Sequence, residues 1–201
     1  MRMCAVCKKK GKAGRMSKLA DFFKAQNREF LKVARGQGRL PQIDKKPVRK
    51  LAVLTCMDTR LLYIVEPALG LNRGEAVVIK VAGARITEAF DSALGSLLVA
   101  VYELGVTDVA VVVHDDCGMV HTTADGLCEK MAAAGVSVPD IQAIRPHLEA
   151  WADPVGEPVP AVRDMVQRLR KNPYIPDSVQ VYGISINPAN GKIHVVEDSM
   201  E

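Results

Sequence analysis

The sequence lacks a long hydrophobic run and has few cysteines, and each shortage excludes a class of protein. Its longest stretch without a charged residue, 178–191, contains Asn187, Pro188 and Asn190, so no segment resembles a helix that spans a bilayer. No apolar run follows the basic residues near the N-terminus, so a secretory signal is not expected. Five unevenly spaced cysteines in 201 residues do not suggest a disulfide scaffold, and we expect a cytoplasmic protein with free thiols.

Acidic residues are absent from one end of the chain, where the positive charge is concentrated. The formal net charge is +4, but residues 1–15 contain six basic residues and no acid. The rest has 21 basic and 23 acidic residues, a net charge of −2. A nucleic-acid-binding protein usually has a basic face on its folded domain, so we expect no such partner. We expect residues 1–16 to be a disordered basic tail and residues 17–201 to form one domain.

Hydrophobic runs and helical periodicities alternate along this domain. Strands are predicted over residues 50–55, 76–82, 108–113, 179–186 and 193–196. Helices are predicted from Ser17 to Gly36 and over residues 60–66, 87–104, 122–134 and 159–171, with a Pro-rich loop around Pro154. This order predicts an α/β fold with a mostly parallel, doubly wound sheet of strand order 2-1-3-4. The last two strands form a hairpin, which adds an antiparallel C-terminal edge strand.

Reactive side chains follow the first and third predicted strands. The sequence CMDTR occupies residues 56–60, and HDDCG occupies residues 114–118. A histidine and a cysteine three residues apart can bind one metal ion. If the first and third strands are neighbours in the sheet, Cys56, His114 and Cys117 meet over one crevice at their carboxyl ends.

Two thiolates and an imidazole suit Zn²⁺ and leave a fourth position open, as in catalytic zinc sites. Iron or cobalt is the alternative metal. Each residue alone could instead be part of the core, and a metal-free Cys–His nucleophile pair is a further alternative, although two cysteines beside one histidine argue against it. Asp115 and Asp116 could each orient the His114 ring by accepting a hydrogen bond from it, and we expect this role for Asp116.

The pattern Cys-x-Asp-x-Arg followed by His-x-x-Cys-Gly resembles the β-class carbonic anhydrases, and HDDCGM is most similar to their short prokaryotic subgroup. The resemblance covers about residues 17–198. It implies that Zn²⁺ binds Cys56, His114 and Cys117. The implied reaction is the reversible hydration of CO₂ to bicarbonate by zinc-bound hydroxide, with no organic cofactor.

The resemblance also gives roles to Asp58 and Arg60. It implies that they form a catalytic dyad, in which Asp58 either pairs with Arg60 or becomes the fourth zinc ligand and closes the enzyme. It further implies a homodimer or homotetramer. The predicted first helix agrees with this, because it holds three of the four phenylalanines and needs an apolar surface to cover it.

One segment departs from the family pattern. Members commonly carry Arg-Asn-Ala-Gly after the second strand, whereas this chain has KVAG at residues 80–83, with Val81 in place of a polar amide. Gly83 keeps the position at which the backbone can approach the substrate. An apolar wall does not distinguish CO₂ from its sulfur analogues, so hydrolysis of carbonyl sulfide or carbon disulfide is an alternative. A non-catalytic zinc-binding protein of this fold is another.

Four further side chains have simple interpretations. Cys4 and Cys7 form a C-x-x-C motif within the basic tail, with no second half of a metal site nearby. Cys128 is expected to be part of the core. His121 could transfer protons, but we expect a solvated surface residue.

Overall fold

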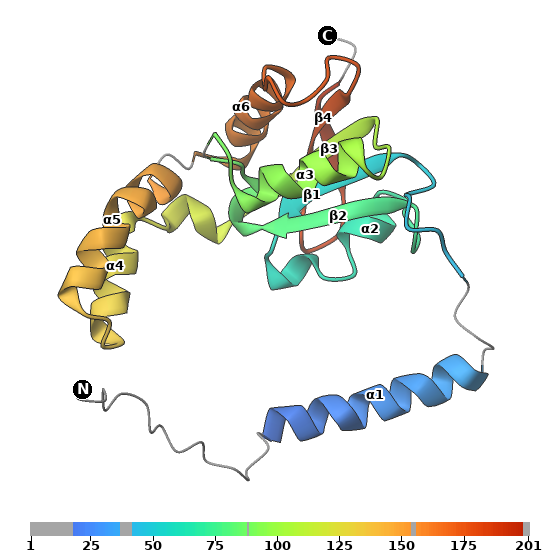
Figure 1. The fold of residues 1–201 in the computed structure, drawn as a ribbon, viewed down its shortest axis with the longest axis horizontal. Coiled ribbons are helices and arrows are strands. Elements are labelled where there is room, and N and C mark those ends of the chain that lie inside the picture. The colour runs from blue at the N-terminus through green and yellow to red at the C-terminus, as the bar shows by residue number, and fades with distance from the viewer. Residues whose placement is uncertain (1–17, 37–41, 88, 154–155, 199–201) are drawn as a thin grey trace, which may run out of the picture. The chain divides into compact units, whose positions relative to one another are not determined.

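Five strands form a single sheet in the order β2-β1-β3-β4-β5 (Figure 1). They are β1 (Leu51–Cys56), β2 (Ala76–Val81), β3 (Asp108–His114), β4 (Gln180–Ile186) and β5 (Ile193–Glu197). The first four are parallel, and β5 pairs antiparallel with β4. The predicted strand order and the antiparallel edge are both confirmed.

The computed structural model describes residues 18–36, 42–87, 89–153 and 156–198. Contacts divide the chain into two compact units, Met1–Gln42 and Ile43–Glu201, and the sheet lies in the second. The predicted tail, with Cys4 and Cys7, lies outside the described residues, as does the predicted helix start at Ser17.

The described helices are α1 (Lys18–Gly36), α2 (Val65–Ala68), α3 (Ser92–Tyr102), α4 (Ala124–Ala133), α5 (Val138–Ala152) and α6 (Pro158–Arg170). Three 3₁₀ turns, η1 (Thr59–Leu61), η2 (Ala82–Ala84) and η3 (Gly118–His121), follow the carboxyl ends of β1, β2 and β3. None of the described helices is long and apolar enough to span a membrane.

Three helices differ from the sequence prediction. In place of the helix predicted over residues 60–66, the chain forms the turn η1 and then α2, which begins at Val65. Helix α3 begins at Ser92 rather than residue 87, because the Asp91 carboxylate caps its first turn by accepting a hydrogen bond from the Leu94 N–H at 2.8 Å. Helix α5 was not predicted at all. It has Ser137 as its N-cap, and Pro146 lies in its interior, where proline usually disfavours a helix.

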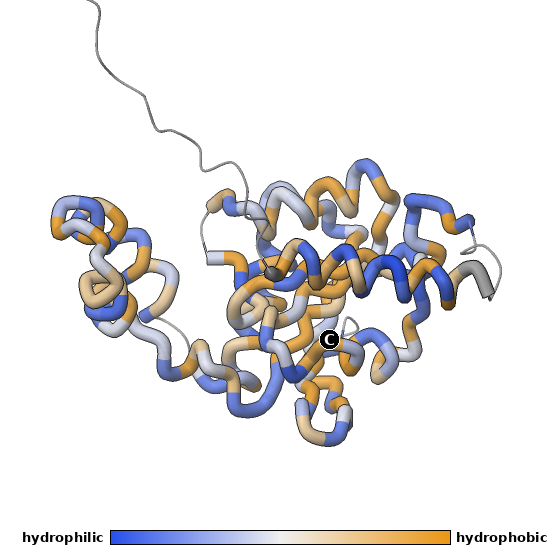
Figure 2. Tube along the Cα trace, turned by 90° about the horizontal axis from the view of Figure 1, so that it is seen from below, coloured by the Kyte–Doolittle hydropathy of each residue, from blue (hydrophilic) through white to orange (hydrophobic). Residues whose placement is uncertain are grey.

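The sheet separates two hydrophobic cores, because successive residues of a strand point to opposite faces. One core includes residues of α3 and α6. Strands β1 and β3 contribute to it Ala52, Leu54, Val109, Val111 and Val113. The core on the other face receives Val53, Ala110 and Val112, and it also contains the two cysteines Cys56 and Cys117. Figure 2 shows hydrophobic stretches concentrated in the middle of this unit.

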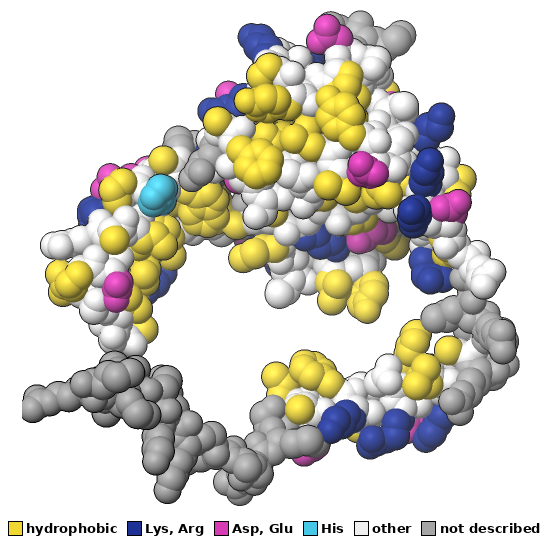
Figure 3. Space-filling view, in the orientation of Figure 1, with side chains coloured by type: hydrophobic (Ala, Val, Ile, Leu, Met, Phe, Trp, Pro, Cys, Tyr) yellow, Lys and Arg dark blue, Asp and Glu magenta, His cyan; other side chains and the backbone are white. Residues whose placement is uncertain are grey.

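Helix α1 has an apolar side that the described residues leave exposed. Five large hydrophobic side chains are more than half exposed: Leu19, Phe22, Phe23, Phe30 and Val33. Figure 3 shows apolar and charged side chains on different sides of this helix. An amphipathic helix of this kind is usually covered by another apolar surface.

Candidate metal centre

The carboxyl ends of β1 and β3 bring three potential metal ligands together. Cys56 is the last residue of β1 and His114 the last residue of β3, and these parallel strands are direct neighbours. Cys117 follows three residues later, at the N-cap of η3. The sequence predicted this meeting from the strand order alone, and the structure confirms it.

The three side chains form a compact, buried cluster. The Cys56 and Cys117 Sγ atoms are 4.0 Å apart, and the ligand atoms of all three residues lie within 4.8 Å of one another. A tetrahedral ion with metal–sulfur bonds of about 2.3 Å would separate two sulfurs by about 3.8 Å. The residues present therefore fit a metal ion.

The imidazole of His114 gives a second indication of a metal. Its Nδ1 lies 2.9 Å from the Asp115 carbonyl oxygen, which leaves Nε2 directed at the cluster. Nε2 is buried and has no hydrogen-bond partner among the described residues. A buried polar atom without a partner is costly, and a metal ion at this position would satisfy it.

The two thiols of the cluster have different pKa values. Burial would raise the pKa of Cys56, but His114 and the backbone of Asp58 and Gly83 lower it to about 7. Burial raises the pKa of Cys117, and the neighbouring Cys56 and Asp58 side chains raise it further. Burial lowers the pKa of His114, but Cys56 and the Asp115 carbonyl outweigh this effect and raise it.

Asp58 and Arg60 form a tightly bonded pair beside the cluster. Arg60 donates to the Asp58 carboxylate from its backbone N–H at 2.8 Å, from Nε at 3.1 Å and from Nη2 at 2.9 Å. These hydrogen bonds lower the pKa of Asp58 to about 2, and those that Arg60 makes raise its own pKa. Asp58 Oδ2 lies 3.8 Å from His114 Nε2, so the carboxylate faces the proposed metal position.

The contacts of Asp116 correct one prediction from the sequence. Its carboxylate accepts a hydrogen bond from Arg60 Nη1 at 2.8 Å and not from His114. The backbone carbonyl of the preceding Asp115 takes the His114 Nδ1 contact instead. Asp116 has a positive φ of 53°, and this turn directs its side chain toward Arg60.

Gly83 lies against the cluster from the end of β2. Its backbone N–H donates to Cys56 Sγ at 3.4 Å. Its φ is +68°, and a Cβ here would lie 3.3 Å from side-chain atoms of Arg85 and Met119. The backbone conformation therefore favours glycine, and a Cβ would press against these two side chains.

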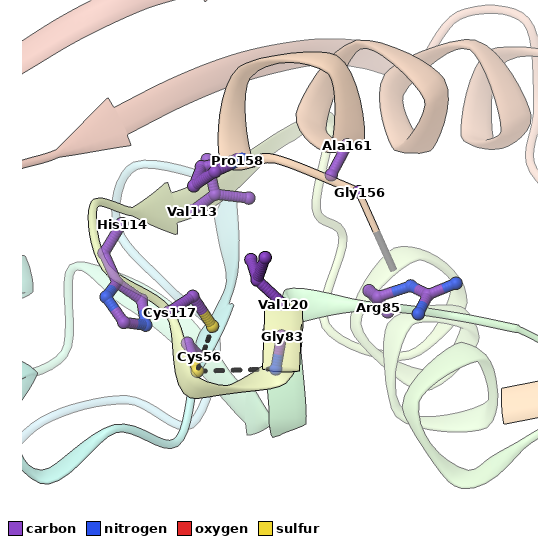
Figure 4. Close-up of a pocket in the computed structure, with 10 residues that line it drawn as sticks. All are labelled: Cys56, Gly83, Arg85, Val113, His114, Cys117, Val120, Gly156, Pro158 and Ala161. Atoms are coloured by element: carbon purple, nitrogen blue, oxygen red, sulfur yellow. Dashed lines mark hydrogen bonds between the residues drawn. The ribbon is translucent and has the colours of Figure 1, made fainter. Parts of the chain in front are cut away.

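Two hollows meet at Cys56 and Cys117. The first, the dyad cleft, has a volume of ≈ 490 Å³ and is lined by residues including Met57, Asp58, Arg60, Ala82 and Met119. The second, the apolar cavity, has a volume of ≈ 20 Å³ and is lined by residues including Val113, Val120, Pro158 and Ala161. Figure 4 shows the cysteines and His114 toward one end of this cavity and Arg85 at the other.

Some residues that line the apolar cavity could not be identified from the sequence. Pro158 and Ala161 come from α6, about 40 residues beyond Cys117 in the chain, and no motif marks them. Two further residues, Cys128 and His121, lie in the core and at the surface, as expected from the sequence. Cys128 is buried in α4, and His121 is exposed at the end of η3.

Known proteins resemble this chain over most of its length. A family model described as carbonic anhydrase matches residues 51–193. Beta-carbonic anhydrase 1 of Mycobacterium tuberculosis is 29% identical over 180 residues, which are 89% of this chain and 98% of that protein. A carbon disulfide hydrolase of Acidithiobacillus thiooxidans is 30% identical over 146 residues, 67% of this chain and 71% of that protein.

A solved structure agrees closely with the fold. The crystal structure of β-carbonic anhydrase isoform I from Trichomonas vaginalis has a TM-score of 0.85 and 35% sequence identity. The similarity covers 92% of this chain and 100% of that one.

Proposed function

The chain belongs to the β-carbonic anhydrase family, and on this basis we propose that it catalyses the reversible hydration of CO₂ to bicarbonate. One observation carries the proposal. The buried Cys56–His114–Cys117 cluster, with an unpartnered histidine nitrogen, opens beside the Asp58–Arg60 pair into a cleft large enough for a small substrate. This arrangement combines a metal site with a fixed hydrogen-bond acceptor.

The metal of the proposal is zinc, held by Cys56, His114 and Cys117. Two sulfurs and one imidazole nitrogen are a common zinc donor set, and three protein ligands leave one position for chemistry. Bound zinc would act as a Lewis acid that lowers the pKa of water, a property for which carbonic anhydrases are themselves the standard example.

The side chains around the cluster have separate roles in the proposal. The Asp58 carboxylate, ionised because Arg60 keeps its pKa low, accepts a hydrogen bond from the attacking water and orients it. Arg60 holds Asp58 by three hydrogen bonds, so the carboxylate stays in the cleft instead of binding the metal. The Gly83 N–H holds the Cys56 sulfur in place.

The proton balance of the reaction also suits the dyad cleft. Water and CO₂ give bicarbonate and one proton, so the proton must leave the site for each turnover. The dyad cleft is a hollow of ≈ 490 Å³ in which Arg60 is partly exposed, and this gives buffer molecules access. Among the residues that the structure describes, the apolar cavity offers no titratable group beyond the three cluster residues and Arg85.

Stopped-flow CO₂ hydration between pH 6.5 and 9, with the zinc content of the same sample, tests the proposal. We expect about one zinc per chain and turnover proportional to zinc content. Turnover at the uncatalysed rate in a fully zinc-loaded sample would contradict the proposal, and it would leave hydrolysis of a sulfur analogue or a non-catalytic zinc-binding protein of this fold.

Hydrolysis of carbon disulfide or carbonyl sulfide is the second candidate function. One observation favours it: the similarity to a carbon disulfide hydrolase. Sulfur analogues of CO₂ are linear and apolar, so the same cleft could accept them. Assays of all three substrates on one zinc-loaded preparation distinguish the two functions by the ratio of their kcat/KM values.

We also propose that the chain works as a homodimer or homotetramer in the cytoplasm. The exposed apolar side of α1 supports an assembly, because such a surface is usually covered. Three cysteines without disulfide partners, Cys56, Cys117 and Cys128, support a reducing compartment. Sedimentation equilibrium tests the assembly, and a monomer at micromolar concentration would contradict it.

A further inference from the structure

The Arg60 guanidinium lies between two carboxylates that come from different loops. On one side it donates to Asp58, two residues earlier in the loop after β1. On the other side Nη1 donates to Asp116 Oδ2 at 2.8 Å, in the loop after β3. We propose that Asp116 is a positioning residue that fixes the Asp58–Arg60 pair relative to His114 and Cys117. Its effect on turnover rests on the proposed function.

The contacts between Asp58 and Arg60 cannot do this by themselves. They join residues two positions apart, and one of them is a backbone cap of the turn η1. Such local hydrogen bonds fix the shape of the loop after β1 but not its distance from the loop after β3. The cluster, however, takes Cys56 from the end of β1, His114 from the end of β3 and Cys117 from the loop after β3.

Asp116 supplies the missing connection between the loops. Arg60 reaches it twice, with Nη1 on the carboxylate at 2.8 Å and Nη2 on the backbone carbonyl at 2.7 Å. The guanidinium is thereby held at both ends, and its rotation about the Nε–Cζ bond is restricted. The carboxylate of Asp58 depends on this guanidinium for its own direction toward His114 Nε2, 3.8 Å away.

The loop that carries Asp116 is itself anchored. The Asp115 backbone N–H donates to the Ile186 carbonyl at 3.2 Å, and the Asn187 side chain donates to the Asp115 carboxylate at 3.1 Å. These contacts join the loop to the end of β4. Asp116 therefore connects the dyad to a fixed part of the sheet.

A purely conformational role for Asp116 is the competing explanation. Its φ of +53° is a backbone conformation that aspartate and asparagine tolerate and that glycine adopts without strain. If the turn alone required Asp116, glycine would replace it fully. If the carboxylate positions Arg60, glycine would keep the turn and lose the contact, so the two explanations predict different results for one variant.

The expected effect is moderate, because the pair is in contact with solvent. The Asp116 side chain is 79% exposed and that of Arg60 is 43% exposed. Exposed ion pairs contribute little, and the second contact through the backbone carbonyl remains in every variant. We expect Asp116→Gly to lower kcat for CO₂ by about three- to tenfold and Asp116→Asn by about two- to threefold, with KM unchanged.

The test compares Asp116→Gly, Asp116→Asn and the control Asp164→Asn in the zinc-loaded protein. Asp164 also pairs with an arginine, Arg168, at 2.7 Å, but on the exposed side of α6. The first readout is kcat and KM for CO₂. The second is the ¹⁵N NMR spectrum of the Arg60 guanidinium, in which restricted rotation gives separate Nη signals.

Support for the proposal requires slow exchange between the Arg60 Nη signals in the wild type and in Asp164→Asn, and faster exchange with lower kcat in Asp116→Gly. Wild-type kcat together with wild-type exchange in Asp116→Gly would overturn it and leave a conformational role. Faster exchange with an unchanged kcat would overturn the effect on catalysis. If the wild type does not hydrate CO₂ but exchange is still faster in Asp116→Gly, the proposed function fails, the effect on turnover fails with it, and the contact itself stands.

Discussion

The dyad cleft and the apolar cavity reach the same two sulfur atoms but differ in size and in chemistry. The cleft has a volume of ≈ 490 Å³ and contains the ionised Asp58 and Arg60. The cavity has a volume of ≈ 20 Å³, near that of one water molecule, and its lining includes the aliphatic side chains of Val113, Val120, Pro158 and Ala161. The same two cysteines therefore have a polar, roomy surrounding in one direction and a tight, largely apolar one in the other.

This difference indicates a division of roles. In the proposed function, the cleft admits the substrate, orients water and releases a proton, because it has both the volume and the charged groups. The cavity is too small for these tasks, and its side chains pack around the ligands. A shell that excludes water from the sulfur side of a metal site stabilises the site and keeps its ligands in one geometry.

Replacement of a metal ligand has the largest expected effect, because it removes the centre that both hollows share. We expect Cys117→Ala to retain well under one zinc per chain and to lose all CO₂ hydration above background. The matched control is Cys128→Ala, which changes a buried cysteine of α4 outside the cluster. Metal analysis and stopped-flow assays check both variants. Full zinc content in Cys117→Ala would contradict the ligand assignment.

Asp58→Asn alters the cleft while leaving the cavity and the ligands intact. Zinc content should remain near one per chain, and kcat/KM for CO₂ should fall by about 10²–10⁴-fold, because a neutral amide is a weaker acceptor of the hydrogen bond from the attacking water and cannot form the ion pair with Arg60. Stopped-flow assays at matched zinc content measure the effect. Unchanged turnover would remove Asp58 from the mechanism.

A pair of larger side chains tests the difference between the two hollows directly. Ala82→Val narrows the dyad cleft and Ala161→Val fills the apolar cavity, with the same two methyl groups added. We expect the first to lower kcat/KM for CO₂ by about tenfold and the second to change it less than about twofold, with a cost in stability instead. Thermal unfolding and stopped-flow assays measure both. The reverse ranking would show that substrate enters from the cavity.

The smallest expected effect is that of pH on metal loss. Both thiols must be deprotonated to bind the metal, and protons compete for them as the pH falls. The pKa of Cys56 is about 7 and that of Cys117 is raised, so proton competition increases on going from pH 8 to pH 6. A chelator should therefore remove zinc several-fold faster at pH 6 than at pH 8. An equal rate at both pH values would contradict ligation by these thiols.

The sequence was sufficient to predict the sheet and the meeting of three potential metal ligands. Runs of valine and isoleucine marked the strands, and the neighbouring positions of β1 and β3 followed from the topology, so the meeting of Cys56 and His114 could be deduced. Helix α5 could not be predicted, because the proline in its interior argues locally against a helix while its packing against α4 supports one.

The prediction that Asp116 accepts a hydrogen bond from His114 was wrong for a different reason. Chemistry alone makes an adjacent carboxylate a good partner for His114, and the left-handed backbone at Asp116 that turns it toward Arg60 leaves no mark in the sequence. The α6 residues that line the apolar cavity, such as Ala161, were equally out of reach, because only the folded chain brings them beside the cysteines.

A crystal structure of the zinc-loaded protein soaked in bicarbonate tests the central claim most directly. Anomalous scattering would locate zinc, and difference density would locate the anion. We predict zinc bound by Cys56, His114 and Cys117, with bicarbonate in the dyad cleft beside Asp58. Zinc elsewhere, or bicarbonate in the apolar cavity, would contradict the account.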